Sequence, residues 1–183
     1  MAQAGYELVR YADDMMILCR SESEARQALE RVQAWTANAG LTLHSDKTRI
    51  VDANQEGFDF LGYHFERGKR WPRDKSLQKF KDAIRSKTPR KHGQRLSVII
   101  ANINRTTWGW FEYFKHTSYA SVFRSLDGLI RRRLRRILLK RHRQHDHNGR
   151  GLAHYRWPNT YFTEQGLFSM EAAHVRIRQS AAR

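Results

Sequence analysis

Short apolar runs separated by turn-forming residues fill the first seventy positions of the chain, a pattern typical of small strands. Residues 6–19 predict two strands, YELVRYA and MMILCR, with Asp13 and Asp14 at or beside the turn that joins them. The segments 41–53 and 57–68 predict further strand pieces broken by turns. We therefore expect a small antiparallel sheet crossed by one helix.

That helix is predicted over residues 22–39, between the two groups of strands. Ser21 and Glu24 form a capping-box pattern at its start, and Gly40 suits its C-terminal cap. Its apolar residues at helical spacing are Ala25, Leu29, Val32 and Trp35.

A domain boundary is predicted near residues 70–75, in RGKRWPRDKS, where Gly and Pro interrupt regular structure and the composition becomes basic. Beyond it, helices are predicted at about 75–86, 94–115 and 119–142. The last helix carries one apolar stripe, made of Tyr119, Val122, Phe123, Leu126, Ile130, Leu134, Ile137 and Leu138. The stripe is expected to pack inward, and the arginines around it are expected to remain in water.

The fold class predicted from these elements is α+β. Residues 1–72 form the part with the small antiparallel sheet and its helix, and residues 73–145 form a helical part. Residues 146–183 are expected to be a basic C-terminal tail, because the arginine-rich helix is expected to fray into a loop after His142.

Charge is distributed unevenly along the chain, which has a formal net charge of +16. Residues 1–70 hold 9 basic and 11 acidic side chains, whereas residues 71–183 hold 25 basic and 7 acidic ones. Such an excess repels itself unless a polyanion lies alongside. Nucleic acid is therefore the expected partner of the second part, and an anionic membrane surface is the weaker alternative.

The composition also favours a soluble, cytoplasmic protein without membrane association. Cys19 is the single cysteine, so neither a disulfide framework nor a multi-cysteine zinc site can form, and we interpret Cys19 as a small core residue. No apolar run approaches the roughly 20 residues of a membrane span, and the N-terminus lacks the layout of a signal peptide.

Asp13 and Asp14 place two adjacent carboxylates in a hairpin that leads into an apolar strand. One interpretation is that they only form the turn, since Asp is common in hairpin loops. The other is a Mg²⁺ site, because Mg²⁺ prefers one or two carboxylates with waters and phosphate oxygens, and phosphoryl transfer often uses two such ions. A further carboxylate from another strand is then required. The tetrapeptide YADD arises by chance in only about one chain per thousand of this length, which favours the metal site.

Five blocks of the sequence carry a resemblance to one protein family. YADD with its apolar strand is similar to the palm catalytic motif of reverse transcriptases. GLTLHSDKTRIV resembles the block after the palm helix, and FDFLGYHF resembles the hairpin that leads into the thumb. INRTTWGWFEYF and YRWPNTYFTEQGLFSM resemble two signatures of maturases. The blocks cover nearly the whole chain in the order found in group II intron-encoded reverse transcriptases and maturases.

This resemblance implies a partial palm that copies RNA into DNA with two Mg²⁺ ions, and a thumb and maturase region that binds intron RNA and assists its splicing and mobility. It implies that Asp13 and Asp14 are catalytic, metal-binding carboxylates. The residues implied at the primer, template or nucleotide are Tyr11, Ala12, Lys47, Phe60, Leu61 and Gly62. The implied partners are group II intron RNA and an RNA/DNA primer-template.

The chain departs from the family pattern at its start. Family members carry a long N-terminal region with the fingers, the first half of the palm and a further catalytic aspartate. We therefore expect the isolated chain to have no polymerase activity unless that portion is supplied in trans or in a longer gene product. The alternative is an RNA-binding maturase fragment that stabilises folded intron RNA without chemistry.

Candidate RNA contacts in the second part are one tryptophan and an arginine run, namely Trp108, Arg131, Arg132, Arg135 and Arg136. A solvated helix face is the alternative for the arginines. The other aromatic side chains near Trp108, including Trp110, Phe111 and Phe114, are expected in the core. Trp108 faces away from that stripe, so it is the candidate for base stacking.

Four histidines raise the possibility of a zinc or HNH-nuclease site, namely His142, His145, His147 and His154. No cysteine pairs accompany them and their neighbours are basic, which disfavours a bound cation. We therefore predict neither a zinc site nor a nuclease domain. The pattern indicates no particular oligomeric state.

Overall fold

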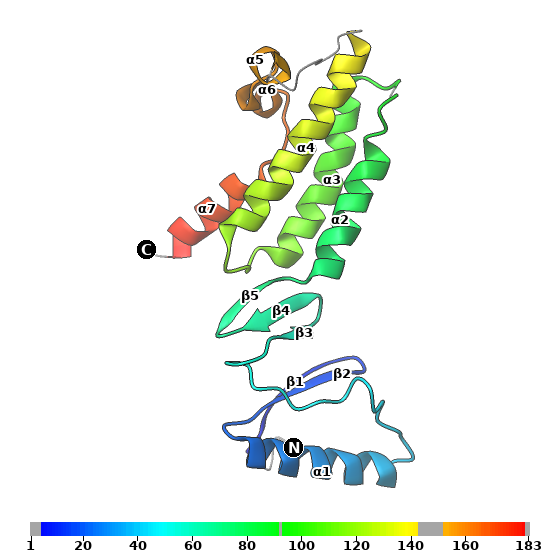
Figure 1. The fold of residues 1–183 in the computed structure, drawn as a ribbon, viewed down its shortest axis with the longest axis vertical. Coiled ribbons are helices and arrows are strands. Elements are labelled where there is room, and N and C mark those ends of the chain that lie inside the picture. The colour runs from blue at the N-terminus through cyan, green and yellow to red at the C-terminus, as the bar shows by residue number, and fades with distance from the viewer. Residues whose placement is uncertain (1–4, 92, 143–151, 182–183) are drawn as a thin grey trace. The chain divides into compact units, whose positions relative to one another are not determined.

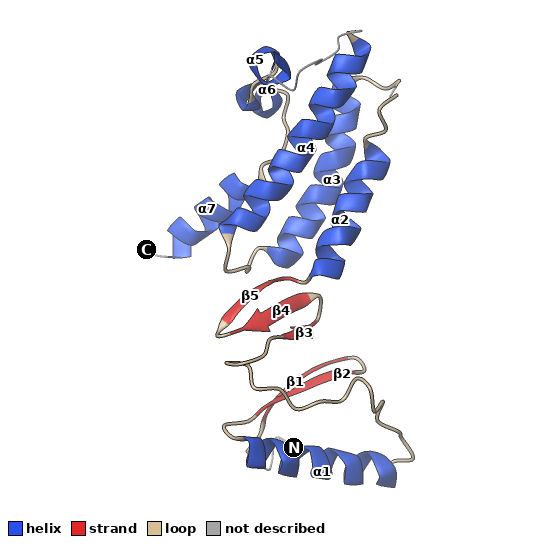
Figure 2. Ribbon diagram, viewed as in Figure 1, coloured by secondary structure: helices blue, strands red, loops and turns tan. Residues whose placement is uncertain are grey.

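The computed structural model describes residues 5–91, 93–142 and 152–181. The chain divides into two compact units (Figure 1). The first unit comprises residues 1–61 with 65–68, and the second comprises residues 62–64 with 69–183. Small strands and one helix make up most of the first unit, and helices dominate the second (Figure 2). The predicted α+β class is therefore confirmed.

The first unit begins with an antiparallel hairpin of β1 (Glu7–Tyr11) and β2 (Asp14–Leu18). Its register runs from Glu7 opposite Leu18 to Tyr11 opposite Asp14, so the connecting turn consists of Ala12 and Asp13 alone. This hairpin confirms the prediction for residues 6–19.

Helix α1 (Glu22–Asn38) follows with the predicted caps at both ends. The Glu24 N–H donates to Ser21 Oγ at 3.2 Å, and the Glu24 carboxylate accepts the Arg20 N–H at 2.7 Å. At the other end Gly40 adopts a φ of +67°, and the Leu41 N–H donates to the Thr36 carbonyl at 2.8 Å. This is a Schellman cap, in which glycine relieves the steric cost of the left-handed conformation.

The buried face of α1 overlaps the predicted apolar stripe only at Val32. Ala28, Val32 and Thr36 are buried, Ala25 and Leu29 are half-buried, and Trp35 is 62% exposed. Thr36 can occupy the buried face because its hydroxyl donates to the Val32 carbonyl at 2.9 Å, which satisfies the polar group within the helix.

The strand predicted within residues 41–53 is also wrong. The N–H groups of Lys47 and Thr48 both donate to the His44 carbonyl. The Glu56 N–H donates to the Asp52 carbonyl. These bonds close local turns and leave no ladder, because the Ser and Asp residues of the segment favour turns over strands.

A three-stranded sheet then follows in the order β3 (Phe58–Phe60), β4 (Tyr63–Glu66) and β5 (Lys69–Pro72). Two-residue turns join the strands, and both residues of each turn have positive φ: Leu61 and Gly62 at +46° and +80°, Arg67 and Gly68 at +49° and +70°. Positive φ at both positions is the signature of type I′ turns. β5 was not predicted, because its basic, proline-ended sequence indicated a boundary instead.

The second unit is built on three long helices, α2 (Asp74–Lys87), α3 (Leu96–Phe114) and α4 (Ala120–Arg141), which lie side by side in Figure 1. Their predicted ranges are confirmed to within a few residues. Three shorter helices, α5 (Leu152–Arg156), α6 (Asn159–Glu164) and α7 (Met170–Ala181), occupy the region expected to be a basic tail. Core residues from all three long helices include Ile84, Ile99, Phe111, Phe123 and Leu134.

A side chain from α4 holds the start of α7. Asp127, only 2% exposed, accepts hydrogen bonds from Ser169 Oγ at 2.7 Å and from the N–H groups of Met170 and Glu171, both at 3.2 Å. Asp127 therefore caps a helix distant in sequence. Burial raises the pKa of its carboxyl, although these hydrogen bonds act in the opposite direction.

His174 anchors the next turn of α7 in the core. It is 1% exposed, and its Nε2 lies 3.1 Å from the Thr117 carbonyl oxygen. Because a carbonyl only accepts, Nε2 carries the ring proton, and Nδ1 is buried without a hydrogen-bond partner among the described residues. Burial, followed by the nearby Arg178, lowers the pKa of His174, whereas the bond to Thr117 raises it.

We expect the free energy of unfolding to decrease as the pH falls below about 6.5, the value for His in an unfolded chain. A His with a lowered pKa in the folded state binds its proton more readily when unfolded, so acid favours unfolding. Urea denaturation at about pH 7.5 and about pH 5.5 measures this loss. His174→Gln keeps an N–H donor but does not titrate, so it should reduce the loss; an equal loss in both proteins would contradict this role.

Candidate catalytic turn and nucleic-acid interface

The β1–β2 turn presents both aspartates to solvent. Asp13 is the second residue of the turn, Asp14 is the first residue of β2, and both side chains are exposed. Asp14 lies opposite Tyr11, which is 67% exposed, so the two side chains share one face of the hairpin. The hairpin thus places two negative charges at one exposed tip.

The two faces of this hairpin are covered to different extents. Leu8 and Ile17 face each other across the strands and are half-buried. Val9 and Leu18 lie on the other face, which is the face of Asp14, and they remain 40% and 45% exposed. Met16 shares the face of Asp14 and is half-buried, and Met15 on the face of Leu8 is 39% exposed, so the two faces differ only in degree.

A strained residue immediately precedes the aspartates. Ala12 has a φ of +53°, a conformation that costs a non-glycine residue about 1–2 kcal/mol. Arg10 donates from Nε to the Ala12 carbonyl oxygen at 2.9 Å, which ties the turn to β1. Sequence reasoning missed Arg10, because an arginine on an exposed strand gives no signal that its side chain bonds back to a turn.

Asp13 and Asp14 provide the kind of ligand that Mg²⁺ takes, since hard carboxylate oxygens suit this ion and waters and substrate phosphates complete its shell. Among the described residues, however, no group of three or more His, Cys, Asp or Glu side chains is placed to hold a metal ion. The two aspartates therefore fit a magnesium ion whose remaining ligands come from elsewhere.

The other residues implied at the primer or nucleotide lie in separate elements. Lys47 is exposed within the turns after α1, and Phe60 ends β3. Leu61 and Gly62 form the β3–β4 turn, where the Gly62 carbonyl accepts bonds from Arg73 N–H at 3.0 Å and from a serine hydroxyl at the start of α2. A Cβ at Gly62 would lie 3.3 Å from that hydroxyl, so both its φ and its packing require glycine.

Arg135 is buried, which corrects the prediction that all the α4 arginines stay in water. Its exposed fraction is 4%, its Nε donates to the Trp157 carbonyl at 2.9 Å, and its Nη2 donates to Asn159 Oδ1 at 2.8 Å. The guanidinium also lies 5.2 Å from the centre of the Phe162 ring. The cause is a second layer of helices, because α5 and α6 cover a side of α4 that the sequence pattern left open.

The remaining candidate RNA contacts are more accessible. Arg132 and Arg136 are exposed, and Arg131 is half-buried. Trp108 is 54% exposed, and its ring packs edge-on against Phe168 with the ring centres 5.1 Å apart. That contact fixes the ring while leaving much of it open to a ligand.

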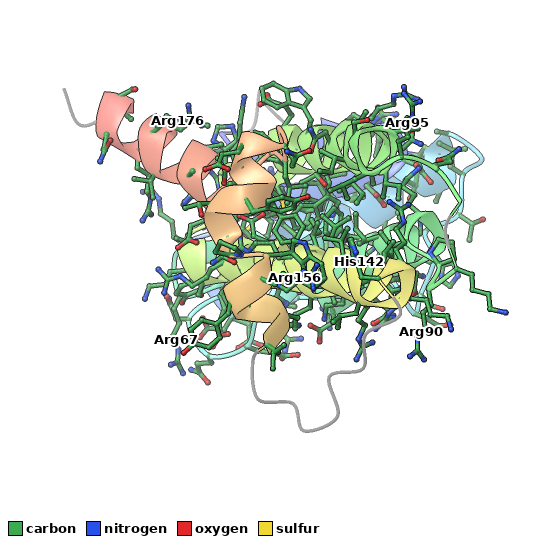
Figure 3. All side chains as sticks on the ribbon, turned by 90° about the horizontal axis from the view of Figure 1, so that it is seen from above. Arg67, Arg90, Arg95, His142, Arg156 and Arg176 are labelled. Atoms are coloured by element: carbon green, nitrogen blue, oxygen red, sulfur yellow. The ribbon has the colours of Figure 1, made fainter. Side chains whose placement is uncertain are left out.

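Of the four histidines, two can be placed. His142 is exposed and packs against the buried Trp157, with the ring centres 5.6 Å apart, and His154 is exposed on α5. Figure 3 labels His142 together with Arg156, whose guanidinium lies 5.3 Å from the centre of the Trp157 ring. His145 and His147 lie outside the described residues.

Comparison with known families assigns both units. Residues 1–65 match the family of reverse transcriptases (RNA-dependent DNA polymerases), and residues 77–157 match the group II intron maturase-specific domain. The chain belongs to the group II intron reverse transcriptase/maturase family. The aspartate hairpin of this reverse transcriptase/maturase lies in the first match, and the arginine-bearing α4 lies in the second. A comparison with curated proteins gave no match.

The family matches imply nucleic-acid binding, RNA included, for this chain. Among the described residues, no helix has the length and apolar character that crossing a membrane requires.

Arg10→Ala should increase the mobility of the turn, because the strained Ala12 loses the bond that ties it to β1. We expect the ¹⁵N order parameters of Ala12 and Asp13 to fall from about 0.85 toward about 0.6. Arg26→Ala is the matched control, since this exposed arginine bonds only within α1, to Glu22. Unchanged order parameters in Arg10→Ala would show that the turn does not depend on Arg10.

Proposed function

We propose that this reverse transcriptase/maturase contributes the YADD part of an RNA-directed DNA polymerase, with Asp13 and Asp14 as its metal-binding carboxylates. The observation that carries the proposal is the hairpin itself: a two-residue turn exposes both carboxylates at one tip within the segment that matches reverse transcriptases. Turn-forming aspartates would also be exposed, so the match to reverse transcriptases is what favours the metal-binding role.

When bound, Mg²⁺ would neutralise charge on the nucleotide phosphates and bring the primer hydroxyl toward its in-line attack. Asp13 and Asp14 would hold the ions, and Arg10 would keep the turn in position through the Ala12 carbonyl. Tyr11 would contact the primer end from the exposed face. Lys47 would bind a phosphate on the nucleotide or template path, and the Phe60–Gly62 turn would support the primer.

We infer that the polymerase function needs further strands from a fingers and palm portion. β1 and β2 form a two-stranded sheet in the described part of the chain, with Val9 and Leu18 exposed on the face that bears Asp14. A lone two-stranded hairpin is marginal in water, and additional strands would bury these side chains. The same strands would supply the third carboxylate that the described residues lack.

The second unit is proposed to bind group II intron RNA and to assist splicing. Arg132 and Arg136 are exposed for contact with phosphates, and Trp108 keeps more than half of its surface open for base stacking. Arg131 would contribute from its half-buried position.

A second candidate is RNA binding without polymerase chemistry. It is favoured by one observation, the absence of any grouping of three potential metal ligands among the described residues. The two candidates share the maturase role and differ only in whether the aspartate hairpin is catalytic.

Primer extension on an RNA template with Mg²⁺, in the presence of a separately produced fingers and palm fragment, tests the catalytic proposal. We expect no extension by the isolated chain, extension by the reconstituted pair, and a loss of at least about 100-fold for Asp13→Asn, because one metal ligand loses its charge. Glu30→Gln, an exposed acidic change on α1, is the matched control.

Equal primer extension by the Asp13→Asn and Glu30→Gln chains, each reconstituted with the fingers and palm fragment, would reject the proposal that the hairpin binds the catalytic metal ions. Reconstitution without activity, together with tight intron RNA binding, would favour the non-catalytic candidate. Robust synthesis by the isolated chain would show that no further palm strands are needed.

A further inference from the structure

Two arginines of α4 tie down the segment that connects α2 with α3. Arg133 donates from Nε to Thr88 Oγ1 at 2.5 Å and from Nη2 to the Thr88 carbonyl at 2.7 Å, at the C-terminal cap of α2. Arg141 donates from Nη2 to the carbonyl of Gln94, one residue before the N-cap of α3. These bonds bring the last turns of α4 against residues 85–95.

The fold thereby gathers basic side chains that the sequence separates by some forty positions. We call this surface the cationic end and define it by Arg90, Lys91, Arg95, Arg136 and Lys140, all of which are exposed. Figure 3 shows Arg90 and Arg95 projecting outward at opposite edges of the view, so the cationic end extends around this end of the helices. The cationic end overlaps the predicted arginine run only at Arg136.

Positive charge at this end is not neutralised within the described part of the chain. None of the five side chains has an ion-pair partner there, and the neighbouring Arg85 is engaged by Asp82 at 2.7 Å. Burial is the largest cause that lowers the pKa of Arg133. The positive charges of Arg136 and Arg85 lower it further, which shows that these cations lie near one another. Such a surface attracts a polyanion.

The chemistry of the surroundings identifies the kind of polyanion. No large apolar side chain is exposed within the described residues of 85–95 or 131–142. A membrane-surface helix needs an apolar face to enter the lipid, and base readout needs hydrogen-bonding or stacking groups. Arginine and lysine can also reach base edges, but this surface has no exposed Phe, Tyr or Trp among its described residues on which a base could stack. Contacts with phosphates, which carry no base information, are therefore favoured.

We propose that the cationic end binds the phosphate backbone of RNA irrespective of base sequence. This inference rests on the proposed RNA-binding function and adds its location and mode. α4 serves twice in this arrangement: Arg133 and Arg141 hold the α2–α3 connection in place, and Arg136 and Lys140 join that connection in contacting phosphates.

The test compares two variants that lose the same charge. The first carries Arg90→Gln, Lys91→Gln and Arg136→Gln, and the matched control carries Lys75→Gln, Lys79→Gln and Arg176→Gln, all at exposed positions outside the cationic end. Fluorescence anisotropy measures the affinity of the full chain for two RNA hairpins of unrelated sequence across a series of salt concentrations. Thermal unfolding checks that both variants are folded.

We expect the first variant to bind roughly tenfold or more weakly, with a slope of log affinity against log salt smaller by about three, because about one counterion is released for each phosphate contact. The control should retain most of the affinity, and the two hairpins should behave alike. Equal losses in both variants would overturn the location. A clear preference for one hairpin would overturn the mode.

Two further outcomes separate this inference from the function on which it rests. If the wild-type chain binds neither hairpin, the proposed RNA-binding function fails as well. If the wild-type chain binds RNA and the first variant binds equally well, only the cationic end is rejected. Phosphatidylserine vesicles that displace RNA from the wild-type chain at a comparable anionic concentration would assign the surface to membranes instead.

Discussion

Burial of the apolar residues of α4 is the interaction on which the helical unit depends. Phe123, Ile130 and Leu134 are each 0% exposed, and burying a large apolar side chain stabilises a protein by about 1.5–3 kcal/mol. Helices α2, α5 and α7 all contact α4, so its position fixes theirs. This packing also decides which arginines reach solvent: Arg135 is enclosed by α5 and α6, whereas Arg136 is left outside.

Turn geometry takes the place of core packing at the aspartate hairpin. Asp13 and Asp14 are exposed, so no apolar contact holds their carboxylates, and their directions follow from a two-residue turn with Ala12 at positive φ. The β3–β4 turn differs, because the Gly62 carbonyl is bonded to the start of α2. The proposed site for metal, primer and nucleotide suits the first arrangement, since the backbone of a short turn and the bond from Arg10 to the Ala12 carbonyl constrain it.

The sequence predicts the long helices well and the short elements poorly, for physical reasons. Periodicity of 3.6 residues over many turns determined α3 and α4, and local caps determined α1. Helices α5 and α6, of 5 and 6 residues, are too short to show a period, whereas α7, of 12 residues, was assigned to a basic tail from its composition. The start of α7 depends on Asp127, a residue forty positions away that no local pattern connects to it. The failed strand at 41–53 contains apolar residues at plausible spacing, but its side chains favour local turns.

Within the candidate site, the sequence predicted the features that depend only on residues adjacent in the chain. The turn around Asp13 follows from local signals, and the resemblance of the YADD motif supplied its proposed chemistry. Residues whose role depends on tertiary hydrogen bonds were not predicted. Arg135 was expected in water and is buried. Nothing in the sequence of the α2–α3 connection indicated that Arg133 bonds to it. Long polar side chains have several possible partners, and only the packed fold selects one.

The same cations that suit RNA binding act against the free helical unit. Arg90, Lys91 and Arg136 repel one another across the cationic end, and apolar burial beneath them must offset that repulsion. Added salt screens the repulsion and so favours the free folded unit, yet it weakens any contact with phosphates. Stability and RNA affinity should therefore respond to salt in opposite directions. RNA bound at the proposed cationic end would relieve the repulsion, so binding and folding of this unit would reinforce each other by mass action.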